Sequence, residues 1–160
     1  MNFYTQVIRI DKNAHTKNIV SDIHLLEPVT RKIVQAIITE AKEHGTDFMV
    51  FETFRSKERQ TVLYNEGVTK LKQVGVHHYG LACDIVLKEG GHPSWDGDFS
   101  LLGQLARKHG LIWGGDWGNP NIKHTFIDPY HIQRCSIKRQ ADLFSGRWYP
   151  DEKYNPYNDQ

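Results

Sequence analysis

The stretch HHYGLACDIVL, residues 77–87, sets histidines and an aspartate around the start of a buried strand. Gly80–Leu87 is short, apolar and flanked by a loop, which is typical of a strand with little solvent contact. His77 therefore stands in a loop seven positions before Asp84, a carboxylate on a predicted strand. Further along, DPYH places Asp128 three positions before His131.

These residue types are those that bind zinc. Zinc accepts imidazole nitrogen and carboxylate oxygen, and a catalytic site has three protein ligands and one open position. His77, Asp84 and His131 fill that set, and a further carboxylate beside them could serve as a base. Spacing alone leaves another reading open, since short His and Asp pairs arise by chance and the chain has no HExxH helix. In that reading Asp84 caps or pairs locally and the histidines are ordinary core or surface groups.

The segments around these stretches alternate between helix and strand without a regular βαβ rhythm, so the expected fold class is α+β. Apolar residues at three- and four-residue spacing predict a helix over Glu27–Glu43. The other predicted elements are a strand over Asp47–Phe54, a helix from a Ser56 cap to Glu66, a strand over Gly80–Leu87, a loop over 88–98, a helix over Leu101–His109, and strands over Leu111–Trp113 and Phe126–Gln133.

Length and composition are those of one globular domain. The 160 residues carry a net charge of +1, so nothing calls for nucleic acid or an anionic membrane as a partner. We expect residues 1–146 to form the domain and 147–160 to be an aromatic tail rather than a second domain. Cys83 and Cys135 are expected to be small buried hydrophobes. No signal peptide or membrane span is recognisable, so synthesis in the cytoplasm is expected.

Four separated stretches resemble a family of zinc peptidases, in the right order over about residues 28–135. HHYGLACD matches the HxxGxAxD signature of D-alanyl-D-alanine carboxypeptidases and L-alanyl-D-glutamate endopeptidases, and DPYH matches their second signature. RSKERQTVLYNEG, residues 55–67, is similar to their Arg-Ser…Gln…Leu-Tyr…Gly helix. WGGDW, residues 113–117, looks like the stretch that precedes the second signature in L-alanyl-D-glutamate endopeptidases. Gly75 departs from the family's usual serine.

The resemblance implies an antiparallel sheet with helices packed on one side and zinc at its centre. It also implies that His77, Asp84 and His131 bind one zinc ion, that Asp128 is the general base, and that Arg55 contacts the substrate. The expected substrate is the L-alanyl-D-glutamate bond of bacterial peptidoglycan, cut by a phage or prophage endolysin that acts as a monomer on the wall after release from the host. Neither nucleic acid nor membrane insertion is expected.

Three alternatives stay open. The chain could be a D-alanyl-D-alanine carboxypeptidase, although those more often carry glutamate as the base. It could be a non-catalytic zinc-containing module that binds the wall, or a part of a virion that also cuts it. Manganese or cobalt could occupy the same ligands. Among the other histidines, His92 and His124 could contact the substrate, whereas His78 is not expected to bind the metal; the surface histidines are His15, His24, His44 and His109.

Overall fold

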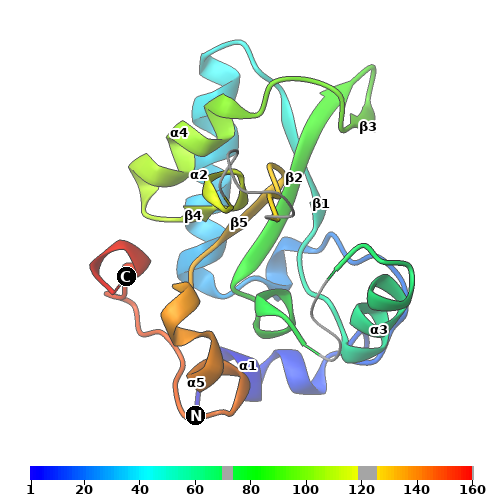
Figure 1. Ribbon diagram of the computed structural model, residues 1–160, viewed down its shortest axis with the longest axis vertical. Coiled ribbons are helices and arrows are strands. Elements are labelled where there is room, and N and C mark those ends of the chain that lie inside the picture. Colours follow the sequence, from blue (N-terminus) through cyan, green and yellow to red (C-terminus); the bar gives the residue numbers. More distant parts are fainter. Residues whose placement is uncertain (70–73, 119–125, 160) are drawn as a thin grey trace.

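The computed structural model describes residues 1–69, 74–118 and 126–159. One antiparallel five-stranded sheet forms its centre, with the order β1-β2-β5-β4 and with β3 paired to the far end of β2 (Figure 1). The strands are β1 (Phe48–Glu52), β2 (Ala82–Glu89), β3 (His92–Ser94), β4 (Ile112–Trp113) and β5 (His131–Gln133). The long strand β2 therefore has partners on both sides.

Two helices, α2 (Pro28–Glu43) and α4 (Ser100–His109), pack together over one face of this sheet (Figure 1). Side chains alternate across a strand, so every second residue of β2 and β5 points into this helical layer. Cys83, Ile85 and Ile132 are buried there against Val34, Ile37 and Leu102. The other face of β2 and β5, called the polar face below, carries Asp84, His131 and Gln133 beside the buried Ala82 and Val86.

The polar face takes its residues from the alternate positions of the same strands. Asp84 of β2 stands directly opposite His131 of β5 in the register. On the other side of β2, the register with β1 shifts between Val50 and Glu52. Such a bulge changes the direction in which side chains point, and Phe51 and Glu52 both line the cavity over the polar face.

The remaining elements are short. They are α1 (Phe3–Gln6), α3 (Lys57–Asn65), α5 (Gln140–Phe144) and 3₁₀ turns at Ile8–Ile10, Ile23–Leu25, Val76–Tyr79, Gly114–Asp116, Ile137–Arg139 and Pro156–Asn158. Of these, α1, α3 and α5 lie toward the end of the sheet where β2 begins (Figure 1). In the part of the chain that the structure describes, none of the helices has the length and apolar character needed to cross a membrane.

The predicted α+β class with an antiparallel sheet and helices on one face is confirmed. The helix expected from Glu27 is α2, the Ser56 cap accepts a hydrogen bond from the Arg59 amide, and the left-handed Gly110 ends α4. Two predicted elements were wrong in extent. The strand expected over Phe126–Gln133 is only β5, because residues 128–130 form a turn, and the loop expected over 88–98 contains β3.

The C-terminal segment 147–159 lies against the domain rather than away from it. The hydroxyls of Tyr149 and Tyr157 donate to the carbonyls of Tyr79 and Leu111. The Tyr154 hydroxyl accepts from the Ser136 amide. Each of these bonds fixes the tail at a different point along the domain.

We expect Arg134→Met to lower the free energy of unfolding by roughly 3 kcal/mol, the cost of breaking a buried ion pair from one side. Arg134 is 1% exposed, pairs with Glu27 at 3.1 Å, and donates to the tail carbonyls of Asp151 and Tyr154. Urea denaturation measures the change. Arg147→Met is the control because Arg147 is exposed and its partner lies on the surface; an equal loss in both variants would contradict the prediction.

Candidate active site

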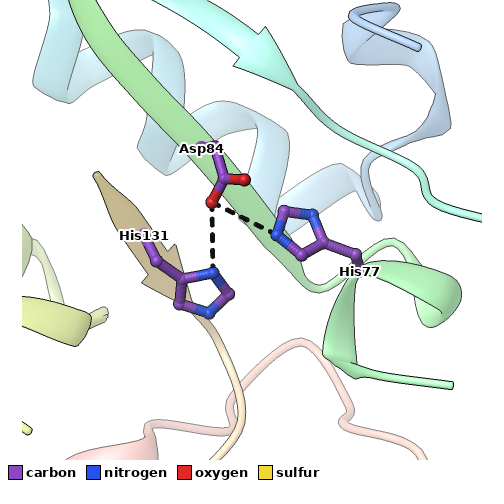
Figure 2. A group of neighbouring side chains, drawn as sticks. All are labelled: His77, Asp84 and His131. Carbon is purple, nitrogen blue, oxygen red and sulfur yellow. Dashed lines mark hydrogen bonds and ion pairs between the residues drawn. The ribbon is translucent and has the colours of Figure 1, made fainter. Parts of the chain in front are cut away.

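Three side chains converge on the polar face of the sheet, each from a different element. Asp84 comes from near the start of β2, His131 from the start of β5, and His77 from the 3₁₀ turn just before β2 (Figure 2). One oxygen of Asp84, Oδ1, lies 3.2 Å from His77 Nε2 and 3.2 Å from His131 Nδ1. Both histidines are buried, and one donor atom from each of the three residues lies within 4.8 Å of the others.

The second nitrogen of each imidazole has a partner that determines where its proton sits. His77 Nδ1 lies 2.7 Å from the Thr53 carbonyl, which can only accept, so Nδ1 donates. His131 Nε2 lies 2.8 Å from Gln133 Oε1, and the Gln133 amide nitrogen is used on the Cys135 carbonyl, so Nε2 donates. In the neutral rings, the lone pairs of His77 Nε2 and His131 Nδ1 therefore both face Asp84.

Three lone-pair atoms facing one another, with no proton among them, need a cation. The separations fit a metal, because tetrahedral ligands about 2.05 Å from zinc stand about 3.3 Å apart, close to the 3.2 Å found between Asp84 Oδ1 and each ring nitrogen. Without a metal, a proton bound by one of these groups supplies the positive charge. Burial lowers the pKa of His131, but the hydrogen bond and charge of Asp84 outweigh burial and raise it.

Asp84 is held as a carboxylate. Burial favours its neutral form, but the imidazoles of His77 and His131 hold the pKa of this carboxyl well below its ordinary value. Its other oxygen, Oδ2, accepts from Arg55 Nη2 at 3.2 Å, and the same nitrogen donates to Glu52 at 2.8 Å. Arg55 thus orients the group that faces both histidines.

Asp128 lies beside this cluster, in the turn that leads into β5. Its amide donates to the Gly114 carbonyl at 3.0 Å, and Trp113 Nε1 donates to the Pro129 carbonyl at 2.7 Å, so the WGG stretch anchors the turn. A side chain at Gly114 would put a Cβ 2.3 Å from the Asp128 carbonyl oxygen. Burial raises the pKa of the Asp128 carboxyl, which brings it closer to the pH at which a general base works best.

A cavity of about 550 Å³ lies over these groups. All five residues that the resemblance assigns to the metal site or to catalysis line it: Arg55, His77, Asp84, Asp128 and His131. Its walls also include residues to which the motifs assign no role, namely Phe51, Glu52, Arg59, Trp95 and Gln133. Their role depends on tertiary contacts rather than on a motif.

The other histidines are placed elsewhere. His78 turns away from the cluster, with Nδ1 on the Arg55 carbonyl and Nε2 on the Tyr4 hydroxyl, and burial lowers its pKa. His92 is exposed at the start of β3 and does not line the cavity. His124 lies outside the described residues. His15, His24 and His44 are exposed, as expected, and His109 pairs with Glu40.

Comparison with known proteins finds a family model that covers three of the four stretches quoted from the sequence, HHYGLACD, WGGDW and DPYH. The model is described as D-alanyl-D-alanine carboxypeptidase and matches residues 69–134. The peptidoglycan L-alanyl-D-glutamate endopeptidase CwlK of Bacillus subtilis (strain 168) is 30% identical over 125 residues, which cover 64% of this chain and 75% of that protein. The L-alanyl-D-glutamate peptidase of Listeria phage A118 is 26% identical over 118 residues, 71% of this chain but only 40% of the phage protein.

Solved structures show the same fold. A variant of the vancomycin resistance D,D-pentapeptidase VanY, in complex with Zn(II), superposes with a TM-score of 0.54 at 18% sequence identity. The match covers 75% of this chain and 78% of that chain. At this identity the likeness concerns the arrangement of helices and strands.

Proposed function

Because the chain belongs to the family of zinc D-alanyl-D-alanine carboxypeptidases and L-alanyl-D-glutamate endopeptidases, we propose that this peptidoglycan peptidase hydrolyses the L-alanyl-D-glutamate bond of the stem peptide. The zinc ion of the proposal is held by His77, Asp84 and His131. The observation that carries the proposal is that lone pairs of His77 Nε2 and His131 Nδ1 face Asp84 Oδ1, with Asp128 beside them.

In this proposal zinc supplies a Lewis acid that makes water a nucleophile near neutral pH and polarises the scissile carbonyl. The protein's own groups do the rest. Thr53 and Gln133 hold the two imidazoles with their lone pairs inward, and Arg55 holds Asp84.

Asp128 acts as the general base of the proposed reaction. Its carboxylate accepts the proton of the attacking water and then delivers that proton to the leaving nitrogen. The backbone bonds that anchor the 128–130 turn keep this carboxylate at the edge of the cluster. A raised pKa suits both transfers, since a carboxylate of low basicity takes up the proton poorly.

Arg55 has a second part in the proposal. Arg55 lines the cavity and its side chain is 12% exposed, whereas its Nη2 is shared between Glu52 and Asp84. A guanidinium group in a cavity wall can donate to a substrate oxygen. Arg55 would therefore contact the substrate through the part of its side chain that lines the cavity, while Nη2 orients Asp84.

The choice of bond follows the more similar relative. CwlK is 30% identical and is an L-alanyl-D-glutamate endopeptidase, and the phage relative is described by the same bond. The second candidate is removal of terminal D-alanine, favoured by the family model's description as D-alanyl-D-alanine carboxypeptidase. Both substrates have a free α-carboxylate on the residue after the scissile bond, so the arginines of the cavity suit either.

Mass spectrometry of digested peptidoglycan distinguishes the two bonds. We expect zinc-loaded protein to release fragments that begin with D-glutamate, and chelator-treated protein to release none until zinc is added back. Release of terminal D-alanine alone would assign the carboxypeptidase activity. No cleavage of several wall types by metal-loaded protein would leave the non-catalytic wall-binding module. Full activity after complete metal removal would contradict the metal site.

The biological setting we propose is lysis by a phage or prophage, supported by the relative in Listeria phage A118. A bacterial wall enzyme is the second candidate, because CwlK is a Bacillus protein. Expression in a bacterial host separates the two. A lysin is expected to leave the host intact until its membrane is permeabilised and then to lyse it rapidly. Wall turnover in an intact host would favour the second role.

A further inference from the structure

One end of the catalytic cavity is walled by aromatic rings from three different elements. Phe51 comes from the bulge of β1, Trp95 follows β3, and Tyr130 precedes β5. The Phe51 and Trp95 rings meet edge to face with their centres 4.8 Å apart. The Tyr130 hydroxyl donates to the Trp95 carbonyl at 3.2 Å. Trp95 is thus held from two sides, yet it remains 41% exposed.

The register of the sheet places this wall close to the proposed metal ligands. Ser94 pairs with Leu87 on β2, so the next residue, Trp95, reaches the level of Val86. Two residues of a strand span about 7 Å, which is the separation along β2 between Val86 and Asp84. Tyr130 is the neighbour of His131 in the chain. The aromatic wall therefore begins about 7 Å along β2 from Asp84, one of the proposed metal ligands.

The opposite end of the cavity is cationic. Arg55 and Arg59 lie at and just inside the start of α3, and one buried carboxylate, Glu52, accepts from both. Arg55 also pairs with Asp84, but Asp84 is assigned to the proposed zinc ion, so two guanidinium groups and one remaining carboxylate, Glu52, leave this end with positive charge. The helix α3 and the β3 hairpin lie at opposite ends of β1 (Figure 1). The cavity thus has a charged end suited to carboxylates and an aromatic end suited to an uncharged ring.

The proposed substrate has the same polarity. In peptidoglycan the amine of L-alanine is acylated by the lactyl group of N-acetylmuramic acid, so the sugar side of the bond is uncharged, whereas D-glutamate and the residues beyond it bear carboxylates. L-alanine and the lactyl group together span about two residue lengths, roughly 7 Å. A sugar joined there would reach the level of Trp95 when the scissile bond lies at the metal ligands.

We propose that Trp95, supported by Phe51 and Tyr130, binds the N-acetylmuramic acid ring on the amino-terminal side of the scissile bond. The C–H face of a sugar packs on the electron-rich face of an indole. This inference rests on the proposed L-alanyl-D-glutamate specificity, because a terminal D-alanine bond lies several residues from the sugar. The protein would then be an enzyme that recognises where the peptide joins the glycan.

Two matched substrates test the sugar contact. The first is N-acetylmuramoyl-L-alanyl-D-glutamyl-diaminopimelate, and the second is the same tripeptide with only a lactoyl group on L-alanine. We expect the zinc-loaded protein to favour the first by about tenfold in kcat/KM. Trp95→Ala should bring this ratio close to one, and Trp95→Phe should keep part of it. The ratio cancels any general loss of activity in a variant.

Tyr64→Ala is the matched control, since Tyr64 is an exposed aromatic residue of α3 that does not line the cavity, and its ratio should stay that of the unaltered protein. A ratio near one in the unaltered protein, or an unchanged ratio in Trp95→Ala, would overturn the sugar contact. An equal loss on both substrates would assign Trp95 to the peptide and overturn it too.

Titration with N-acetylmuramoyl-L-alanine, followed by calorimetry, separates this inference from the proposed function. Trp95→Ala should weaken that binding about tenfold. If neither substrate is cleaved, the proposed function fails while the titration still decides the sugar contact; equal affinity in both proteins, or no binding by either, would reject it.

Discussion

Replacing Asp128 with asparagine should lower kcat by about 10²- to 10⁴-fold, the range that a positioned general base contributes. Asparagine has the same shape, and its carbonyl oxygen can still accept the Tyr130 amide that now donates to Asp128 Oδ1 at 3.3 Å. It cannot take up a proton. The raised pKa of Asp128 arises mainly from burial, which disfavours the charged form. A neutral amide at this position should therefore not destabilise the fold.

Metal content and fold separate loss of the base from damage to the site. We expect Asp128→Asn to bind one zinc ion per chain and to unfold at the same urea concentration as the unaltered protein. Asp116→Asn is the control from the same region, since Asp116 is partly exposed and paired with Arg107, and it should retain full turnover. Undiminished activity in Asp128→Asn would reject Asp128 as the base.

The candidate site could be predicted from the sequence to the extent that its residues lie in short motifs on regular elements. His77 and Asp84 are joined by one turn and one strand, and the alternation along β2 puts Asp84 on the face opposite Cys83 and Ile85. Asp128 and His131 are likewise fixed by a turn of three residues. In each pair, local spacing determines most of the geometry.

The residues that hold the proposed metal ligands could not be predicted in this way. Gln133 acts on His131 from two positions along the same strand, and an ordinary glutamine in a strand gives no sign of that role. Glu52 and Phe51 line the cavity because of a bulge, which a sequence that is simply apolar and aromatic does not reveal. Trp95 lies in a segment rich in glycine and proline, where only pairing with β2 produces β3.

The difference between local spacing and contacts between distant segments also explains why one strand is shorter than predicted. Phe126–Gln133 contains enough apolar residues for a strand, but Asp128 and Pro129 turn the chain before it reaches β5. The hydrogen bonds from Asp128 to Gly114 and from Trp113 to Pro129 stabilise that turn. Contacts between distant segments thus override local preference at Asp128, the proposed base.

Replacing His131 with alanine should abolish stoichiometric metal binding. Asp84 would then share its Oδ1 with His77 alone, and two ligands do not fill a catalytic zinc site. Gln133→Leu should have a smaller effect, a 10- to 100-fold weaker affinity for zinc, because His131 stays but the acceptor that holds its Nε2 proton is lost. Competition with a chromophoric chelator measures both affinities without any need for activity.

The order of the two effects tests the role of each residue. His44→Ala removes an exposed histidine far from the cavity and should leave the zinc affinity unchanged. Full zinc stoichiometry in His131→Ala would remove His131 from the ligand set. If Gln133→Leu bound zinc as tightly as the unaltered protein, the proton on His131 would not be fixed by Gln133. The metal itself, rather than the fold, would then have to orient the His131 ring so that its lone pair faces Asp84.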